Sequence, residues 1–247
     1  MLARIDFNCD LGEGCDDATV LPYISSANIA CGLHAGDAAT MRRTVALCIA
    51  HGVAIGAHPS FDDRAHFGRR EIDCTPEEVH HLVFAQVVAL AEIAGDRGAP
   101  LTHVKPHGTL YNMAARDPAL AEAIASAVHD FDPDLILYGL SGSALTAAGE
   151  RQGLRVAHEV FAERRYGADG RLVPRGEAGA VIEDLEASLA QVRSIVRDGV
   201  VIARTGERVT LRADTLCLHG DRPDAASFAR AVRELLESDG IRVQAPG

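Results

Sequence analysis

The segment 101–112, LTHVKPHGTLYN, holds the residues whose types and spacing best suit chemistry. Side chains alternate between the two faces of a strand, so His103, Lys105 and His107 share one face. Pro106 cannot donate to a strand ladder, so the strand is expected to end near it. Two imidazoles and an ammonium at the carboxyl end of a strand are typical of an α/β active site.

Lys105 is the only lysine of the chain, which otherwise carries its positive charge on arginine. Codon bias would also leave one lysine by chance. A compact ammonium, however, acts as a point charge and shifts its pKa on burial far more readily than a planar guanidinium does. We therefore interpret Lys105 as a functional residue that stabilises negative charge on a reacting group.

Composition limits the class of protein. A chain of 247 residues can build one α/β barrel or two small domains. A net charge of −11 with scattered arginines argues against a nucleic-acid partner. No segment has the pattern of a signal peptide or a membrane span. The six cysteines form no C-x-x-C pair, which is typical of reduced thiols in the cytoplasm.

Strands and helices are expected to alternate about seven times, which predicts a parallel sheet with crossover helices. The expected strands are 3–9, 27–31, 53–57, the strand of segment 101–112, 134–138, 154–161 and 215–218, with a hairpin at 200–211. The expected helices run from the N-cap Asp37 to His51, from the capping box at Thr75, from Pro118 to Val128, from Ser143 to Gln152, along Val181 to Val196, and from Pro223 to Ser238, which closes the chain.

Nearly every expected strand ends in polar groups: Asp10, His34, His58, Lys105 with His107, Glu159, and His219 with Asp221. In an open doubly wound sheet only some strands contribute to a site, whereas in a barrel all strand ends meet at one mouth. The sequence shows no linker that would divide the chain. We therefore predict a single barrel domain over 1–247, with the doubly wound sheet as the alternative.

Local motifs exclude several chemistries. The one lysine precedes proline, so there is no Walker A loop, and Gly12 and Gly14 lack the third glycine of a dinucleotide fingerprint. A metal site stays an option, because carboxylates and imidazoles that suit Zn, Mn or Fe follow separate strands: Asp10, Glu13, His34, His58, His107 and His219. Without a metal, Asp10 or a histidine would serve as general base and Lys105 as electrophile.

Other charged residues allow two interpretations each. His103 lies deeper along its strand than Lys105, so a hydrogen-bonded core histidine and a catalytic one are equally good interpretations. The pair Arg69 and Arg70 could hold a carboxylate or phosphate. The arginines between Arg164 and Arg175 could do the same, but a solvated loop is the preferred interpretation for that group.

Several motifs resemble the LamB/YcsF family along essentially the whole chain. They are DFNCDLGE at 6–13, NIACGLHAGD at 28–37, GAHP at 56–59, FGRR at 67–70, VKPHGTLYN at 104–112, EVFAER at 159–164 and CLHGD at 217–221. One departure is the pair Ser60 and Phe61, where the family usually has a glycine and an aromatic residue. It removes no ionisable group.

The resemblance implies a distorted seven-stranded parallel barrel of the glycoside hydrolase/deacetylase type. It also implies cleavage of the lactam 5-oxo-L-proline to L-glutamate, with ATP and Mg as co-substrate, in a complex with the subunits PxpB and PxpC. Opening a lactam needs an activated carbonyl and a water nucleophile, so Lys105 would neutralise the lactam oxygen while Asp10 or His107 activates water. The expected substrate-binding residues are Asn8, Glu13, His34, His58, Arg69, Arg70, Glu159 and His219.

Two rival functions remain on the sequence alone. One is a metal-dependent carbohydrate deacetylase on the same barrel, and the other is a non-catalytic lactam-binding subunit whose partners carry the chemistry. The sequence contains no recognisable ATP loop, so it does not place ATP. It also leaves the catalytic metal and the oligomeric state open, a homo-oligomer being among the options.

Overall fold

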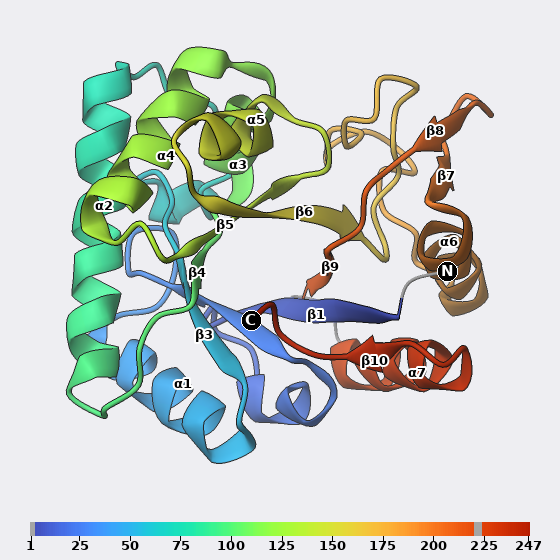
Figure 1. The fold of residues 1–247 in the computed structure, drawn as a ribbon, viewed down its shortest axis with the longest axis horizontal. Helices are drawn as coiled ribbons and strands as arrows, with labels where there is room; N and C mark the ends of the chain where they lie inside the picture. The colour runs from blue at the N-terminus through green and yellow to red at the C-terminus, as the bar shows by residue number, and fades with distance from the viewer. Residues whose placement is uncertain (1–2, 220–223) are drawn as a thin grey trace.

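Seven parallel strands close into a barrel in the computed structural model, which describes residues 3–219 and 224–247 (Figure 1). The strands are β1 (Arg4–Leu11), β2 (Ser26–Ala30), β3 (Ala54–His58), β4 (His103–Val104), β5 (Ile136–Leu140), β6 (Arg155–Phe161) and β9 (Thr215–His219). Strand β9 pairs with both β6 and β1, which closes the ring. The predicted barrel is confirmed, and the closure excludes the doubly wound sheet.

The strand boundaries differ from the predicted ones by a few residues. Strand β1 continues to Leu11 because Asp10 and Leu11 still pair with β2 before Gly12 turns the chain at φ 75°. Strand β4 has only two residues, since the chain leaves the ladder before Pro106, which has no N–H to donate. The ionisable residues therefore still follow the strands at one end of the barrel.

Helices surround the barrel and are fixed by capping residues. They are α1 (Ala38–His51), α2 (Pro76–Gly95), α3 (Gly108–Arg116), α4 (Pro118–Phe131), α5 (Ala144–Arg151), α6 (Leu185–Asp198) and α7 (Ala225–Ser238). The predicted caps are confirmed: Asp37 accepts from Thr40 N, Gly52 ends α1 in the left-handed region, and Thr75 forms a capping box with Glu78.

Helix α2 requires a correction, because the sequence was expected to contain no segment near a membrane span. Its 20 residues are long and apolar enough to cross a bilayer by length and composition. In the structure α2 packs on α4 and β3, and its stripe of Val79, Val83, Val87 and Leu90 is buried. It is thus placed as a core helix of the barrel.

Two further predictions about chain segments are wrong. Helix α6 begins after its N-cap Asp184, and Val181 instead forms an isolated antiparallel bridge with Arg164. The strand that ends at His219 is not the last, because β10 (Arg242–Val243) pairs with the start of β1. The predicted hairpin is confirmed as β7 (Val200–Ile202) and β8 (Arg208–Thr210). The expected polar strand end at Asp221 and helix start at Pro223 lie outside the described residues.

The barrel interior is polar, whereas the apolar core lies between the strands and the helices. On β1, Ile5, Phe7 and Cys9 belong to the apolar core, as predicted, and Asp6 points inward. The Asp6 carboxylate accepts four hydrogen bonds of 2.6–2.9 Å, from Ser25, Ser26, Tyr138 and Thr215. This satisfied network forms a rigid floor beneath the groups at the barrel mouth.

Candidate functional site

The strand-end residues that were predicted to share a pocket do meet at one mouth of the barrel. The Asp10 carboxylate lies 2.9 Å from Nζ of Lys105, 3.3 Å from Nε2 of His58 and 3.8 Å from Nε2 of His219. Nδ1 of His107 lies 3.0 Å from Nε2 of His58. All five residues line one pocket. The prediction that these side chains converge is confirmed.

Lys105 is buried between two carboxylates at the base of the pocket. Its Nζ lies 2.9 Å from Asp10 Oδ1 and 2.9 Å from Glu159 Oε1, and it also contacts Asn8 Oδ1 at 3.3 Å and Cys217 Sγ at 3.1 Å. Burial alone would lower the pKa of the ammonium, but the surrounding negative charges outweigh it and raise that pKa well above its ordinary value. The site therefore contains a fixed positive charge.

Asp10 is ionised although it is buried. Burial raises the pKa of a carboxyl group, but the charges of His58 and Lys105 outweigh burial here and hold the Asp10 pKa well below its ordinary value. The Asn28 amide also donates to Asp10 Oδ1 at 2.8 Å. Asp10 is thus oriented by three neighbours, and its charge is available to the pocket.

Asn8 and Glu159, which were expected to bind substrate, both contact the ammonium of Lys105. The Asn8 amide donates to Glu159 Oε1 at 3.0 Å and to Thr215 at 2.7 Å, and both Asn8 and Glu159 are fully buried. Neither is among the residues that line the pocket. The structure therefore places them where they hold Lys105 in position.

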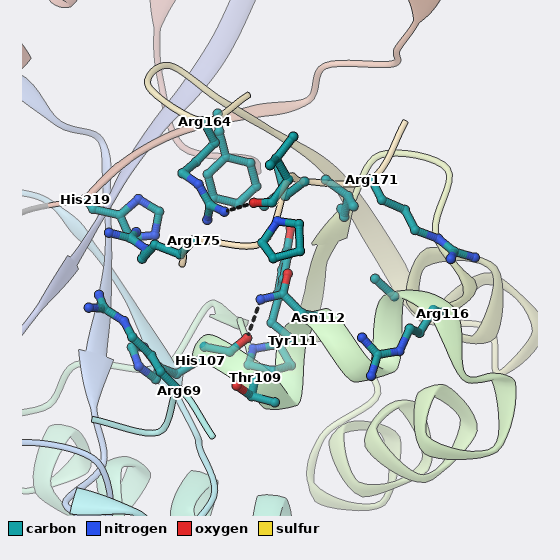
Figure 2. Close-up of a pocket in the computed structure, with 18 of the residues that line it drawn as sticks. Arg69, His107, Thr109, Tyr111, Asn112, Arg116, Arg164, Arg171, Arg175 and His219 are labelled. Atoms are coloured by element: carbon teal, nitrogen blue, oxygen red, sulfur yellow. Dashed lines mark hydrogen bonds between the residues drawn. The ribbon is translucent and has the colours of Figure 1, made fainter. Parts of the chain in front are cut away.

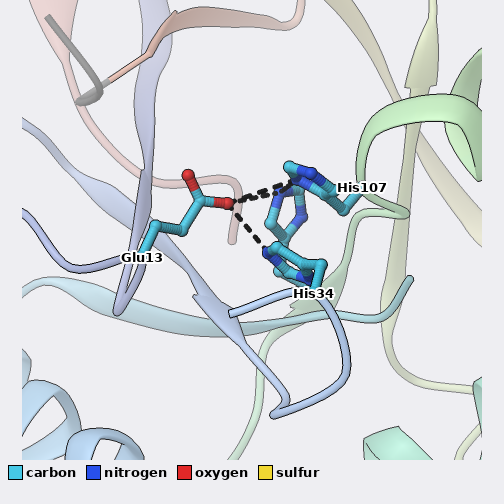
Figure 3. Close-up of side chains that lie close together, drawn as sticks. Glu13, His34 and His107 are labelled. Atoms are coloured by element: carbon cyan, nitrogen blue, oxygen red, sulfur yellow. Dashed lines mark hydrogen bonds and ion pairs between the residues drawn. The ribbon is translucent and has the colours of Figure 1, made fainter. Parts of the chain in front are cut away.

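Three histidines and Glu13 form a compact cluster beside Asp10, which Figure 3 shows for Glu13, His34 and His107. One carboxylate oxygen of Glu13 lies 3.0 Å from Nε2 of His34, 3.2 Å from Nδ1 of His107 and 3.7 Å from Nε2 of His58. Burial lowers the pKa of His34 to about 4 and also lowers that of His107. Donors of this kind can hold a metal ion, as can a second group of Asp10, Cys217 and His219.

The pocket itself has a volume of about 770 Å³ and is rich in cations. Figure 2 shows arginines from separate segments around it. The lining includes Arg69, Lys105, Arg116, Arg164, Arg171, Arg175 and Arg204 against the carboxylates of Asp10, Glu71 and Asp169. This excess of positive charge contrasts with the net charge of −11 for the chain. It indicates that the pocket accepts an anionic ligand.

Arg164 requires a correction, since a solvated loop was the preferred interpretation for the arginines between Arg164 and Arg175, and of these Arg171 is exposed. Arg164 is buried, and its guanidinium donates to the carbonyl of Val173 at 2.7 Å. Its Nε has no hydrogen-bond partner among the described residues. Burial lowers the Arg164 pKa to about 10, so the group stays charged at neutral pH. A buried donor of this kind can bind an anion that enters the pocket.

The pair Arg69 and Arg70 divides between two environments. Arg69 lines the pocket, and its guanidinium lies 4.8 Å from the centre of the Phe67 ring. Arg70 is not among the lining residues; it lies 3.7 Å from Asp63, and 62% of its side chain is exposed. The structure therefore favours Arg69 over Arg70 as a ligand-binding residue.

Glu163 is a site residue that reasoning from strand ends missed. It lies in the loop after β6, is buried, and forms a short ion pair with Nδ1 of His219. Burial opposes its charge, but His219 outweighs burial and lowers the Glu163 pKa. The available signal was its place in the EVFAER motif at 159–164.

His103 is a core histidine, which decides between the two interpretations left open by the sequence. Its Nε2 contacts Asn28 Oδ1 at 2.8 Å, and its ring stacks on Tyr138 with centroids 4.2 Å apart. Burial lowers the pKa of His103 to about 3. It is not among the pocket-lining residues and serves the barrel floor.

The fold and the site define a β/α barrel with an arginine-lined pocket at the carboxyl ends of its strands. The chain belongs to the LamB/YcsF family, whose sequence profile matches residues 5–247. It is 57% identical over 251 residues to a 5-oxoprolinase subunit of Bordetella pertussis, an alignment that covers 99% of this chain and all of that protein. It is 53% identical over 250 residues to a 5-oxoprolinase subunit of Geobacillus kaustophilus, covering 99% and 98% of the two chains.

Solved structures agree with this assignment. The lactam utilization protein of Thermus thermophilus is 45% identical and superposes with a TM-score of 0.92, covering 98% of this chain and 100% of that one. A family 4 carbohydrate esterase from Streptomyces lividans gives a TM-score of 0.50 at 10% identity, covering 99% and 93%. The second likeness shows a shared fold and nothing about the reaction.

Proposed function

We propose that this chain is the lactam-cleaving subunit of a cytoplasmic 5-oxoprolinase, which converts 5-oxo-L-proline to L-glutamate with hydrolysis of ATP in a complex with PxpB and PxpC. The observation that carries the proposal is the fixed ammonium of Lys105 at the base of an arginine-lined pocket. The names of relatives that are 51–57% identical over nearly the whole chain support it.

The chemistry of the substrate matches the charges of the pocket. 5-Oxoproline carries one carboxylate and one lactam carbonyl, so it needs a cation for the first and an electrophile for the second. The buried guanidinium of Arg164 offers a donor to the carboxylate, and Lys105 offers its ammonium to the lactam oxygen. Lys105 is held by Asn8 and Asp10 on β1, Glu159 on β6 and Cys217 on β9, so it needs little reorganisation as charge develops.

Coupling to ATP would activate a carbonyl that resonance makes unreactive. Transfer of the terminal phosphoryl group to the lactam oxygen releases ADP and makes the carbon electrophilic. Water then attacks this carbon, the carbon–nitrogen bond breaks, and the nitrogen takes a proton. A second water releases phosphate from the resulting acyl phosphate and leaves glutamate. Lys105 would stabilise the charge on oxygen, and the arginines would bind the phosphate.

Asp10 is the better candidate than His107 for orienting the attacking water. Both line the pocket, but His107 uses Nε2 to donate to the Phe67 carbonyl at 2.9 Å and directs Nδ1 at Glu13. Asp10 keeps an ionised carboxylate beside Lys105. Its low pKa makes it a weak base, so its main contribution would be to position water next to the activated carbon.

The test is glutamate formation from 5-oxoproline by the chain alone and with PxpB and PxpC, with and without ATP and Mg. We expect slow or no turnover by the chain alone and ATP-dependent turnover by the complex. Full activity of the pure chain would remove the need for partners. Absence of glutamate in every mixture would refute the proposed reaction. If the complex still turns over after the positively charged pocket residues of this chain are replaced, the chain would serve as a binding subunit only.

A further inference from the structure

The cluster of Glu13, His34, His58 and His107 has too few hydrogens for its own contacts. One oxygen of Glu13 faces nitrogens of all three rings at 3.0, 3.2 and 3.7 Å, and the inner nitrogens of His58 and His107 lie 3.0 Å apart. Each of these contacts needs a hydrogen or a cation between the two atoms, because the bare atoms present only lone pairs to each other.

In His58 and His107, the ring nitrogen that points away from the cluster donates its hydrogen to a backbone carbonyl oxygen. Nδ1 of His58 lies 2.7 Å from the carbonyl of Lys105, and Nε2 of His107 lies 2.9 Å from the carbonyl of Phe67. A carbonyl oxygen can only accept, so both nitrogens must donate. A neutral His107 then presents a lone pair at its inner nitrogen, whereas His58, whose Nε2 lies 3.3 Å from the ionised Asp10, carries a second hydrogen on its inner nitrogen.

In His34, too, the ring nitrogen that points away from Glu13 donates a hydrogen bond, in this case to a hydroxyl group. The hydroxyl of Ser60 donates its one hydrogen to the carbonyl of Phe61 at 2.9 Å, so its oxygen accepts from Nδ1 of His34 at 2.8 Å. Nε2 of His34 then presents a lone pair to the Glu13 carboxylate. The second hydrogen of His58 serves Asp10 or His107, so the contacts of Glu13 with His34 and His107 are still left without a hydrogen.

We propose that Glu13, His34, His58 and His107 bind one divalent transition metal ion. Two atoms that each lie about 2.1 Å from one ion are roughly 3.0–3.4 Å apart at octahedral and tetrahedral angles. Of the six separations among the four donor atoms, three are 3.0, 3.0 and 3.2 Å and fall in this range, a fourth is 3.7 Å, and all six are within 4.8 Å. Three imidazoles and one carboxylate suit Zn²⁺ and exclude ions that require oxygen ligands, such as Mg²⁺.

The surroundings of the cluster support binding. Outer hydrogen bonds that fix the far nitrogen of each imidazole are the usual support of metal-binding histidines. The three rings are buried, and His34 stacks on His107 with centroids 3.8 Å apart, so the donors are held in place. His58 and His107 line the pocket, which gives an ion a way in. The donor set is distinct from Asp10, Cys217 and His219, where the ammonium of Lys105 contacts Cys217 at 3.1 Å and would repel a cation.

The experiment is a titration of the chelator-treated full chain with Zn²⁺ by competition against a chromophoric chelator, repeated with Mg²⁺. We expect the chain to bind one Zn²⁺ ion, and we expect that Mg²⁺ does not bind to this site. Glu13→Gln and His34→Gln should weaken binding by more than the roughly 10- to 100-fold that loss of an outer-shell partner costs, and Ser60→Ala should lose about that amount. His80→Gln is the matched control, because His80 lies on the outside of α2 and pairs with Asp130.

A spectroscopic measurement on the wild-type chain keeps the test independent of how the variants fold. With Co²⁺ in place of Zn²⁺, absorption and X-ray fine structure should show imidazole nitrogen and oxygen and no thiolate sulfur. A sulfur ligand would place the ion at Cys217 and overturn the assignment. Absence of stoichiometric Zn²⁺ binding, or equal affinity in wild type, Glu13→Gln and His34→Gln, would overturn it as well. None of these readouts depends on 5-oxoproline turnover.

Discussion

Replacing Lys105 by methionine removes the ammonium at the base of the pocket and keeps most of the apolar stem. In the structure this ammonium lies 2.9 Å from a carboxylate oxygen of both Asp10 and Glu159. Its loss leaves two buried carboxylates without their shared cation. Breaking a buried pair in this way costs about 3–5 kcal/mol. Since a domain has only about 5–15 kcal/mol of stability in total, the single variant would mix a folding defect with a catalytic one.

The double variant Lys105→Met with Glu159→Gln separates the two effects. It removes one charge of each sign, and glutamine keeps an oxygen that can accept from the Asn8 amide, which now donates to Glu159 at 3.0 Å. We expect most of the lost stability to return. Turnover should stay low by about 100- to 1000-fold, because a lost oxyanion-type donor costs roughly 3–4 kcal/mol at the transition state.

The assay is ATP-dependent glutamate formation by the reconstituted complex at saturating substrate, with thermal unfolding of each variant as the folding control. Near-normal turnover in the double variant would refute the reasoning, because Lys105 would then only neutralise Glu159. Lys105→Arg should restore little, since the wider planar group must fit where Lys105 is 2% exposed. Normal rates in that variant would reduce the role of Lys105 to that of a generic positive charge.

Two further outcomes are expected. Arg69→Ala should raise the Michaelis constant more than it lowers turnover, whereas Arg70→Ala should match wild type because Arg70 lies outside the pocket lining. If the Michaelis constants and turnover of both variants equal those of wild type, Arg69 does not bind the substrate. Gly56→Ala should destabilise the chain by about 1–3 kcal/mol or more in chemical denaturation, because a Cβ there would lie 2.1 Å from Nε2 of His103. Gly95→Ala, with no atom within 4 Å of its added carbon, is the control and should be neutral or stabilising.

Features governed by local physics were predictable from the sequence. The caps of α1 and α2 at Asp37, Gly52 and Thr75 follow from the few side chains that satisfy free backbone groups, and all three are observed. Val181 was misplaced because a helical spacing of apolar residues does not exclude an extended segment with the same residues. The strand β10 was missed because its two residues pair with the distant start of β1, which no local pattern records.

The same division holds for the site. Asp10, His58, Lys105 and His107 were predicted to converge because the carboxyl ends of parallel strands share one side of a barrel. The pairing of Lys105 with two carboxylates, and hence the cost of removing it, depends on side-chain contacts that spacing does not give. Loop residues such as Arg164 and Glu163 have no periodicity, so their burial could not be inferred from the pattern of the sequence.

The position of Lys105 links the closed fold to the proposed chemistry. Its ammonium contacts Asn8 on β1, 97 positions away in the sequence, and Cys217 on β9, 112 positions away. These two strands are neighbours only because β9 pairs with β1 and closes the barrel, with Asn8 opposite Cys217 in the register. An open sheet of the same strands would leave the ammonium without one side of its binding site. Closure of the barrel is therefore the step of folding that gives the pocket its fixed positive charge.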